Sequence, residues 1–244
     1  YDQNQAGILK YAQGILDHDL PPGVLMIDDN WQADYGKWDF KKGKFSDPKA
    51  MVATLHAEGF KVMLWMCPFV SPDCDVYRDL AKRNLLVKDG SGQSAIVRWW
   101  NGASALLDFT NHKTVEWFRS QFDYLQATYH VDGFKFDGGD SSYYCGVTTF
   151  RPMSPNAQTE LYGKIGLNYP LNEYRAMWKM GGQPLGELEH VIELPAVLLL
   201  TPARVVEVLL PAGVVDAGGL QVAERVGADP HLPPGRRNRQ PLDP

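Results

Sequence analysis

Hydrophobic and polar residues follow two different spacings along the first three quarters of the chain. Apolar runs occupy residues 24–27 and 61–66, and a third run at 133–137 alternates aromatic with charged residues. Runs of this length, bounded by Pro or Gly, are typical of strands. Residues 106–109 form a further, brief extended piece.

Between these runs, apolar residues recur every three to four positions, which is the spacing of amphipathic helices. Asp2 would cap the first helix, and Asp47 with Pro48 would open the second. We expect two more helices, one after Asp73 and one from Asn111. The last helix would turn one apolar stripe to the core, made of Val115, Phe118, Phe122 and Leu125.

Short strands separated by helices predict right-handed βαβ units and a parallel sheet. A doubly wound sheet and a (β/α)8 barrel share this local pattern. No Gly-rich phosphate loop follows a strand, and the informative polar residues stand at the carboxyl ends of strands, where barrel active sites lie. The sequence therefore predicts an α/β fold that is a partial (β/α)8 TIM barrel. A complete barrel takes about 250 residues, so the alternating part is about half of one.

The composition changes near residue 186. All Trp, Tyr and Phe residues precede Met180, and residues 186–244 also lack Lys, Ser, Met and Cys. We therefore divide the chain into a partial catalytic domain at 1–185 and an atypical tail without aromatic residues at 186–244. The tail is either a low-complexity segment or, as we favour, non-native sequence such as a shifted reading frame.

Charge and composition exclude several classes of protein. The net charge of -5 argues against nucleic acid as a partner, because phosphate binders need a basic field. No apolar stretch is long enough to span a membrane, and three cysteines do not make a disulfide scaffold. The chain begins at Tyr1 without a leader, so we expect a fragment of a longer protein.

The run at 133–137 places Lys135 and Asp137 on one face of a strand, because side chains alternate. A solvated charge pair on a half-exposed strand is one interpretation. The other is an active-site carboxylate that the Lys135 ammonium keeps ionised, which suits a glycosidase nucleophile. Asp28 also follows a strand, where it either caps a turn or lines a site.

Aromatic side chains leave two interpretations open. Trp65 lies on the strand at 61–66, and we expect Trp99 and Trp100 in a loop. These rings either belong to the core or present the flat faces that carbohydrate sites offer to sugar rings.

A metal site has weaker support. The six His residues show no ligand spacing. A metal-dependent α/β hydrolase that uses Asp28, Asp29, Asp137 and Asp140 nevertheless remains an alternative.

Five strings in order together resemble glycoside hydrolase family 31, in its α-glucosidase and α-galactosidase branch. They are IDDNW (27–31), KVMLWMCPF (61–69), VRWWNG (97–102), LDFT (107–110) and FKFDGGD (134–140). The resemblance covers residues 1–186. It implies a (β/α)8 barrel, of which this chain would hold about strands two to five, and a retaining mechanism on an α-glycoside or oligosaccharide. It implies neither a metal nor an organic cofactor.

The same resemblance assigns roles to individual residues. Asp137 would be the nucleophile, with Lys135 as its neighbour. The substrate would be bound by Asp28, Trp65, Trp100 and Arg175, of which Asp28 would bind sugar hydroxyls and the two Trp would wall the subsite for the reacting sugar.

One departure from the family concerns the acid/base residue. The resemblance implies an Asp near position 191, where this chain has Val191, and the nearest acidic residues are Glu189 and Glu193. We therefore expect a chain that lacks its acid/base and is inactive by itself. A protein that binds sugar without hydrolysis is the alternative.

Overall fold

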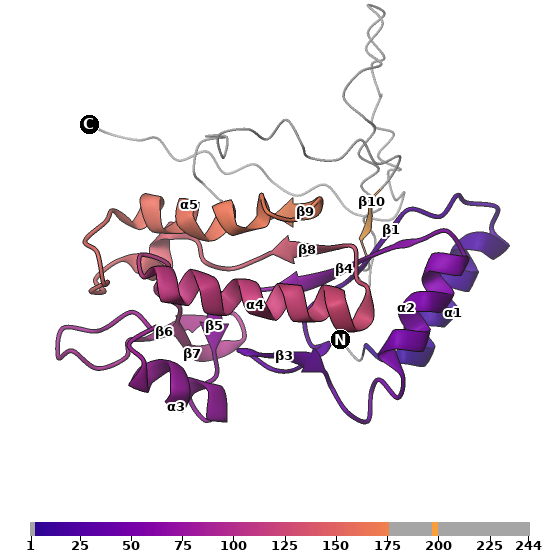
Figure 1. Cartoon of the computed structure of the whole chain (residues 1–244). Helices are drawn as coiled ribbons and strands as arrows, with labels where there is room; N and C mark the ends of the chain where they lie inside the picture. Colours follow the sequence, from indigo (N-terminus) through magenta and orange to yellow (C-terminus); the bar gives the residue numbers. More distant parts are fainter. Residues whose placement is uncertain (1–2, 176–196, 200–244) are drawn as a thin grey trace, which may run out of the picture. The chain divides into compact units, whose positions relative to one another are not determined.

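The computed structural model describes residues 3–175 and the strand at 197–199 (Figure 1). The helices are α1 (Gln5–Asp17), α2 (Pro48–Ala57), α3 (Asp75–Lys82), α4 (His112–Tyr129) and α5 (Pro155–Gly166), with a 3-10 turn η1 (Ser141–Tyr144). The strands are β1 (Val24–Ile27), β2 (Gln32–Asp34), β3 (Lys37–Phe40), β4 (Lys61–Met66), β5 (Phe69–Val70), β6 (Ile96–Trp99), β7 (Gly102–Leu106), β8 (Gly133–Phe136), β9 (Leu171–Tyr174) and β10 (Val197–Leu199).

A parallel sheet forms the centre of the fold. Strands β1, β4, β8 and β9 lie side by side in chain order, and every pair among these neighbours is parallel. A doubly wound sheet would reverse its strand order at a switch point, whereas consecutive barrel strands follow the chain. The predicted α/β partial barrel is therefore confirmed. β10 pairs with β1 on the other side, with Val24 opposite Val197.

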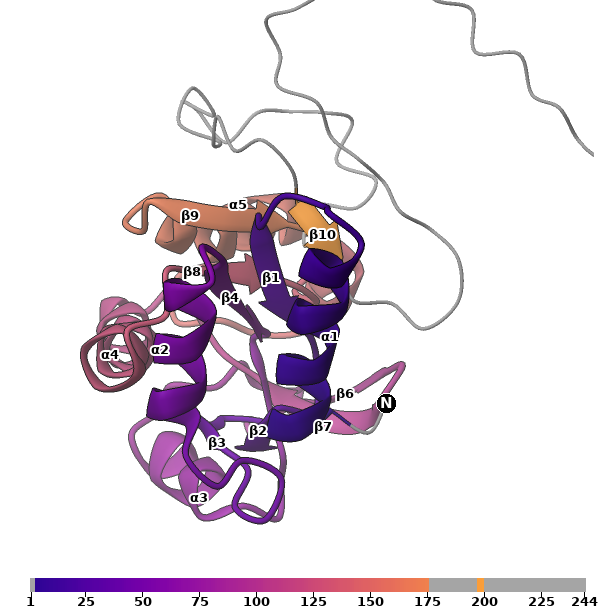
Figure 2. The same ribbon diagram turned by 90° about the vertical axis from the view of Figure 1, so that its right-hand side faces the viewer.

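Helices cover the outer face of this sheet, as Figure 2 shows for α1, α2 and α4. The ring of Phe122 on α4 lies 4.5 Å from that of Phe134 and 5.4 Å from that of Phe136, between centroids. Both Phe side chains of β8 therefore point outward into an aromatic core. Because side chains alternate along a strand, Lys135 and Asp137 point to the inner face.

The helix starts follow from local capping. Asp47 accepts a hydrogen bond from the Ala50 N–H at 2.9 Å, and Asn111 caps α4, as predicted. The prediction for the first helix was wrong. Asn4, not Asp2, is the residue before α1 and accepts from the Gly7 N–H at 2.9 Å.

Two antiparallel insertions follow the first two central strands. β2 and β3 form a hairpin after β1, and β5, β7 and β6 form a small sheet after β4. In Figure 1 this small sheet lies at the end toward which β4 and β8 point. The carboxyl ends of the central strands therefore face the insertions.

The small sheet corrects two expectations from the sequence. Trp99 is not in a loop: it ends β6 and is buried, while Trp100 does lie in the turn. The extended piece expected at 106–109 is centred earlier, on β7, where Gly, Ala and Ser carry little strand propensity. Cross-strand pairing, rather than local sequence, decides this element.

The remainder of the tail expected at 186–244 lies outside the described residues, so the division after residue 185 stays a prediction. Within the described part of the chain, no helix combines the length and apolar character needed to cross a membrane.

At the opposite end of the sheet, Asp132 connects the starts of β8 and β4. Its carboxylate accepts from the Val62 N–H at 2.8 Å and lies 2.7 Å from His56 Nε2 and 3.1 Å from Lys61 Nζ. We expect Asp132→Ala to lower the free energy of unfolding by about 1–3 kcal/mol, because a buried N–H loses its acceptor. Chemical denaturation measures this loss.

Asp79→Ala is the matched control, since Asp79 forms an exposed ion pair with Arg83 on a single helix. Exposed pairs of this kind contribute little to stability. Equal losses in the two variants would contradict the role given to Asp132.

Candidate active site

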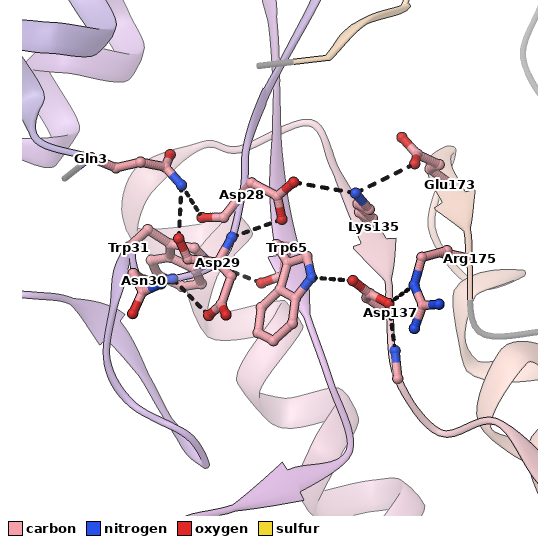
Figure 3. A network of polar contacts seen from close by, with 11 residues as sticks. Gln3, Asp28, Asp29, Asn30, Trp31, Trp65, Lys135, Asp137, Glu173 and Arg175 are labelled. Atoms are coloured by element: carbon pink, nitrogen blue, oxygen red, sulfur yellow. Dashed lines mark hydrogen bonds and ion pairs between the residues drawn. The ribbon is translucent and has the colours of Figure 1, made fainter. Parts of the chain in front are cut away.

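Four central strands bring polar side chains to one region of the inner face (Figure 3). Trp65 on β4 is in register with Lys135 on β8, which is in register with Glu173 on β9. Asp28 directly follows β1, whose Ile27 pairs with Leu64. Because the strands are parallel and in register, these four residues form one row across the sheet, and Asp137 and Arg175 lie two residues further along their strands.

The carboxylate of Asp137 is buried and receives hydrogen bonds from three directions. Trp65 Nε1 donates to Oδ2 at 2.7 Å, and the backbone N–H of Gly138 donates to Oδ1 at 2.7 Å. The guanidinium of Arg175 donates to the same Oδ1 through Nε. Hydrogen bonds to a carboxylate from several donors of this kind fix it in one orientation.

Arg175 connects Asp137 to two other groups. Its Nη2 lies 3.4 Å from Asp140 Oδ2, and its guanidinium carbon lies 4.7 Å from the centre of the Trp100 ring. Partial burial acts to lower the pKa of Arg175, but the charges of Asp137 and Asp140 outweigh it and raise that pKa. The guanidinium is therefore a fixed positive charge beside Asp137.

Lys135 has different partners from those predicted. Its ammonium lies 3.3 Å from Asp28 Oδ2 and 3.8 Å from Glu173 Oε1. The cation in contact with Asp137 is Arg175, and not Lys135 as the spacing along the strand suggested. Lys135 pairs with Glu173 on the neighbouring strand β9 and, beyond β4, with Asp28 at the end of β1, which spacing along β8 alone does not reveal.

Glu173 was missed by the sequence analysis. Burial raises its pKa, and the charges of Asp28 and Asp137 add to that rise, while Lys135 acts against it. Its second oxygen, Oε2, is buried without a hydrogen-bond partner. Glu173 lies on β9 two residues before Arg175, so alternation of side chains would have placed it on the same face of the sheet as Arg175.

The two predicted Trp side chains occupy different environments. Trp65 is fully buried, and what it offers Asp137 is its indole N–H. Trp100 is 51% exposed at the hairpin turn and stacks over the Arg175 guanidinium. Both lie beside the Asp137–Arg175 pair, Trp65 as a hydrogen-bond donor and Trp100 as an open ring face.

The carboxylates proposed for a metal site are engaged by donors. Asp28 accepts from the Asp29 N–H and pairs with Lys135, and Asp29 accepts from the side chains of Gln32 and Tyr35. Within residues 3–175, no group of His, Cys, Asp or Glu side chains is placed to hold a metal ion. This donor set favours a hydrogen-bonded charge cluster over a cation site. The acid/base candidates, Glu189 and Glu193, and Val191 lie outside the described residues.

Comparisons with known proteins agree with this geometry. Residues 1–189 match the profile of the glycosyl hydrolases family 31 TIM-barrel domain. The mouse myogenesis-regulating glycosidase is 39% identical over 167 residues, which are 67% of this chain and 23% of that protein. The α-xylosidase XylQ of Lactiplantibacillus pentosus is 26% identical over 78% of this chain and 24% of its own length. The chain thus spans about a quarter of these relatives.

Solved structures show the same fold. A family 31 dextranase of Flavobacterium johnsoniae, complexed with glucose, superposes with a TM-score of 0.62 at 20% identity, over 71% of this chain and 24% of that one. The cycloalternan-degrading enzyme of Trueperella pyogenes, in complex with isomaltose, gives 0.64 at 20% identity, over 72% and 30%.

The raised pKa of Glu173 gives a prediction about stability. An acid whose pKa rises on folding binds more protons in the folded state than in the unfolded state. Its ionisation therefore lowers the free energy of unfolding as the pH rises above its pKa in the unfolded chain, near 4.5. Glu173→Gln removes this loss. We expect the variant to melt at a higher temperature than the parent at about pH 7.5, with the difference shrinking toward about pH 4.

Glu160→Gln serves as the control, because Glu160 forms an exposed pair with Lys164 on α5. A melting difference for Glu173→Gln that is the same at both pH values would contradict the electrostatic origin of the effect.

Proposed function

The chain belongs to glycosyl hydrolase family 31, and on this premise we propose that it carries the nucleophile half of a retaining α-glycoside hydrolase site. The observation that supports this proposal most is the setting of Asp137. It follows a central barrel strand, and its carboxylate is oriented by an indole N–H, a backbone N–H and a guanidinium. Such a carboxylate is fixed in direction, as a nucleophile must be.

In the proposed reaction, an oxygen of Asp137 forms a bond to the anomeric carbon while the bond to the leaving oxygen breaks. The leaving oxygen takes a proton from an acid. Water later attacks the anomeric carbon of the glycosyl–enzyme intermediate while giving a proton to the same residue, and the bond from that carbon to the Asp137 oxygen breaks. Arg175 balances the charge of Asp137 before attack. As Asp137 loses that charge in the ester, the Trp65 and Gly138 donors keep it aligned.

Five residues are proposed to hold the sugar. Asp28 and Lys135 provide charged hydrogen-bonding groups at one level of the inner face, and Arg175 provides them at the next. Trp100 offers an open ring face beside Arg175, and the buried Trp65 acts through its hydrogen bond to Asp137. A flat ring such as Trp100, half exposed beside charged groups, suits the apolar face of a sugar while the charges bind its hydroxyls.

The identity of the acid separates two candidate functions. The family resemblance implies an Asp near Val191, and this chain has none there. This favours a second candidate, a domain that binds α-glycosides without cleaving them. The candidate substrates are α-glucosides, α-galactosides and α-xylosides. The proposed reaction uses no cofactor.

α-Glycosyl fluorides separate the two candidates, because fluoride leaves without needing a proton. We expect the chain to release fluoride from one of the α-glucosyl, α-galactosyl and α-xylosyl fluorides, while the matching alkyl glycoside stays intact. Fluoride release is followed with an ion-selective electrode. Binding by calorimetry without fluoride release would support the binding-only candidate and contradict the nucleophile.

Asp137→Ala should reduce fluoride release by about 10³-fold or more, because no covalent intermediate can form. Added azide should restore part of the rate and give a glycosyl azide of inverted configuration, identified by NMR. The exposed Asp79→Ala variant should keep the parental rate. Asp137→Ala activity within tenfold of the parent would remove Asp137 from this role.

A further inference from the structure

A second polar cluster lies beside the proposed site and takes no part in the chemistry above. It consists of Asp29 after β1, Tyr35 between β2 and β3, and Asn101 in the turn between β6 and β7. The Asn101 side-chain amide donates to Asp29 Oδ2 and, at 2.9 Å, to the Tyr35 hydroxyl. That hydroxyl in turn donates to Asp29, 3.0 Å from Oδ2. The three side chains form a closed ring of hydrogen bonds, which we call the Asp29 ring.

The Asp29 ring joins segments that are far apart in sequence. Asn101 and Asp29 are 72 residues apart, and Asn101 and Tyr35 are 66 apart. Asp29 is further held by Gln32 Nε2 at 3.0 Å and by the Asn30 N–H at 2.7 Å. The Asp29 carboxylate is therefore held in one position, and its hydrogen bond with Asn101 attaches the turn between β6 and β7 to it.

The turn secured by the ring carries Trp100. Trp99 pairs with Gly102, so Trp100 and Asn101 form the two-residue turn. The Trp99 ring stacks on Phe69 with centroids 4.2 Å apart, which fixes the base of the turn. Trp100 is half exposed and projects to the Arg175 guanidinium. An exposed turn is free to move unless its tip is bound, and Asn101 binds this tip.

We propose that Asn101 is a positioning residue: through Asp29 and Tyr35 it holds the β6–β7 turn so that the Trp100 ring stays over Arg175 and faces the sugar. The part of this inference that concerns the sugar rests on the proposed function. The contacts predict a specific pattern. Loss of Asn101 affects substrate binding through Trp100, and it leaves the core intact because its own side chain is exposed.

A double-mutant cycle tests the dependence on Trp100. With an α-glycosyl fluoride that the chain hydrolyses, Asn101→Ala should raise KM about fivefold with little change in kcat, as expected for one lost positioning contact. In a protein that already carries Trp100→Ala, Asn101→Ala should not raise KM further. A KM increase that is equal in both backgrounds would overturn the proposal.

Two further variants grade the effect, and a control accompanies them. Tyr35→Phe removes the hydroxyl from the Asp29 ring but keeps the aromatic contact with Trp99, whose centroid lies 4.8 Å from that of Tyr35. We therefore expect a smaller rise in KM than for Asn101→Ala. Asn101→Asp places a second carboxylate against Asp29 and should therefore raise KM more than Asn101→Ala does. Arg98→Ala, an exposed change on the same hairpin, should leave KM unchanged. An effect of Arg98→Ala as large as that of Asn101→Ala would count against the ring.

A fluorescence measurement tests the ring without any sugar. The difference in acrylamide quenching between the parent and Trp100→Phe isolates the Trp100 signal. The same difference, taken in the Asn101→Ala background with and without Trp100→Phe, should be larger, because the Trp100 ring is then less restrained. The melting temperature of Asn101→Ala should change by less than about 2 °C. An unchanged difference would overturn the positioning role. If the parent neither binds nor hydrolyses any sugar, the proposed function fails, and the quenching result alone decides whether the ring holds Trp100.

Discussion

The burial of the Asp137 carboxylate is the constraint on which the site depends. A carboxylate removed from water is costly unless donors replace its hydration. Three elements supply those donors: β4 contributes the Trp65 N–H, the turn after β8 contributes the Gly138 N–H, and the residue after β9 contributes Arg175. The Gly138 N–H is local, but the Trp65 and Arg175 donors reach Asp137 only when neighbouring strands are parallel and in register. The barrel geometry is therefore a condition for keeping this charge in place.

The same register separates the charges into two levels. Asp28, Lys135 and Glu173 alternate in sign across one row, with Lys135 between two carboxylates. Asp137 and Arg175 form the next row toward the strand ends. Burial raises the pKa of Glu173, and the charges of Asp28 and Asp137 add to that rise, while the single ammonium of Lys135 acts against it. This arrangement sacrifices stability at a site proposed to bind substrate, as is common for functional sites.

The insertions after β1 and β4 complete the site from outside the sheet. Central strands can present side chains only from their own inner face, whereas the β6–β7 hairpin brings an open aromatic ring over Arg175. Its stacked Trp99 and the Asp29 ring fix the base and the tip of that hairpin. Variation in these insertions can change the shape of the site without disturbing the barrel, which is how barrel enzymes diversify.

Features that depend on neighbours along the chain could be predicted from the sequence. The strands at 24–27, 61–66 and 133–137, the caps at Asp47 and Asn111 and the inward direction of Asp137 all follow from alternation and local hydrogen bonds. Which charges meet depends instead on the fold. Lys135 pairs with Asp28, 107 residues away, and Arg175 rather than Lys135 contacts Asp137. The reason is physical: periodicity fixes which face a side chain occupies, but strand register and side-chain reach choose its partner across the sheet.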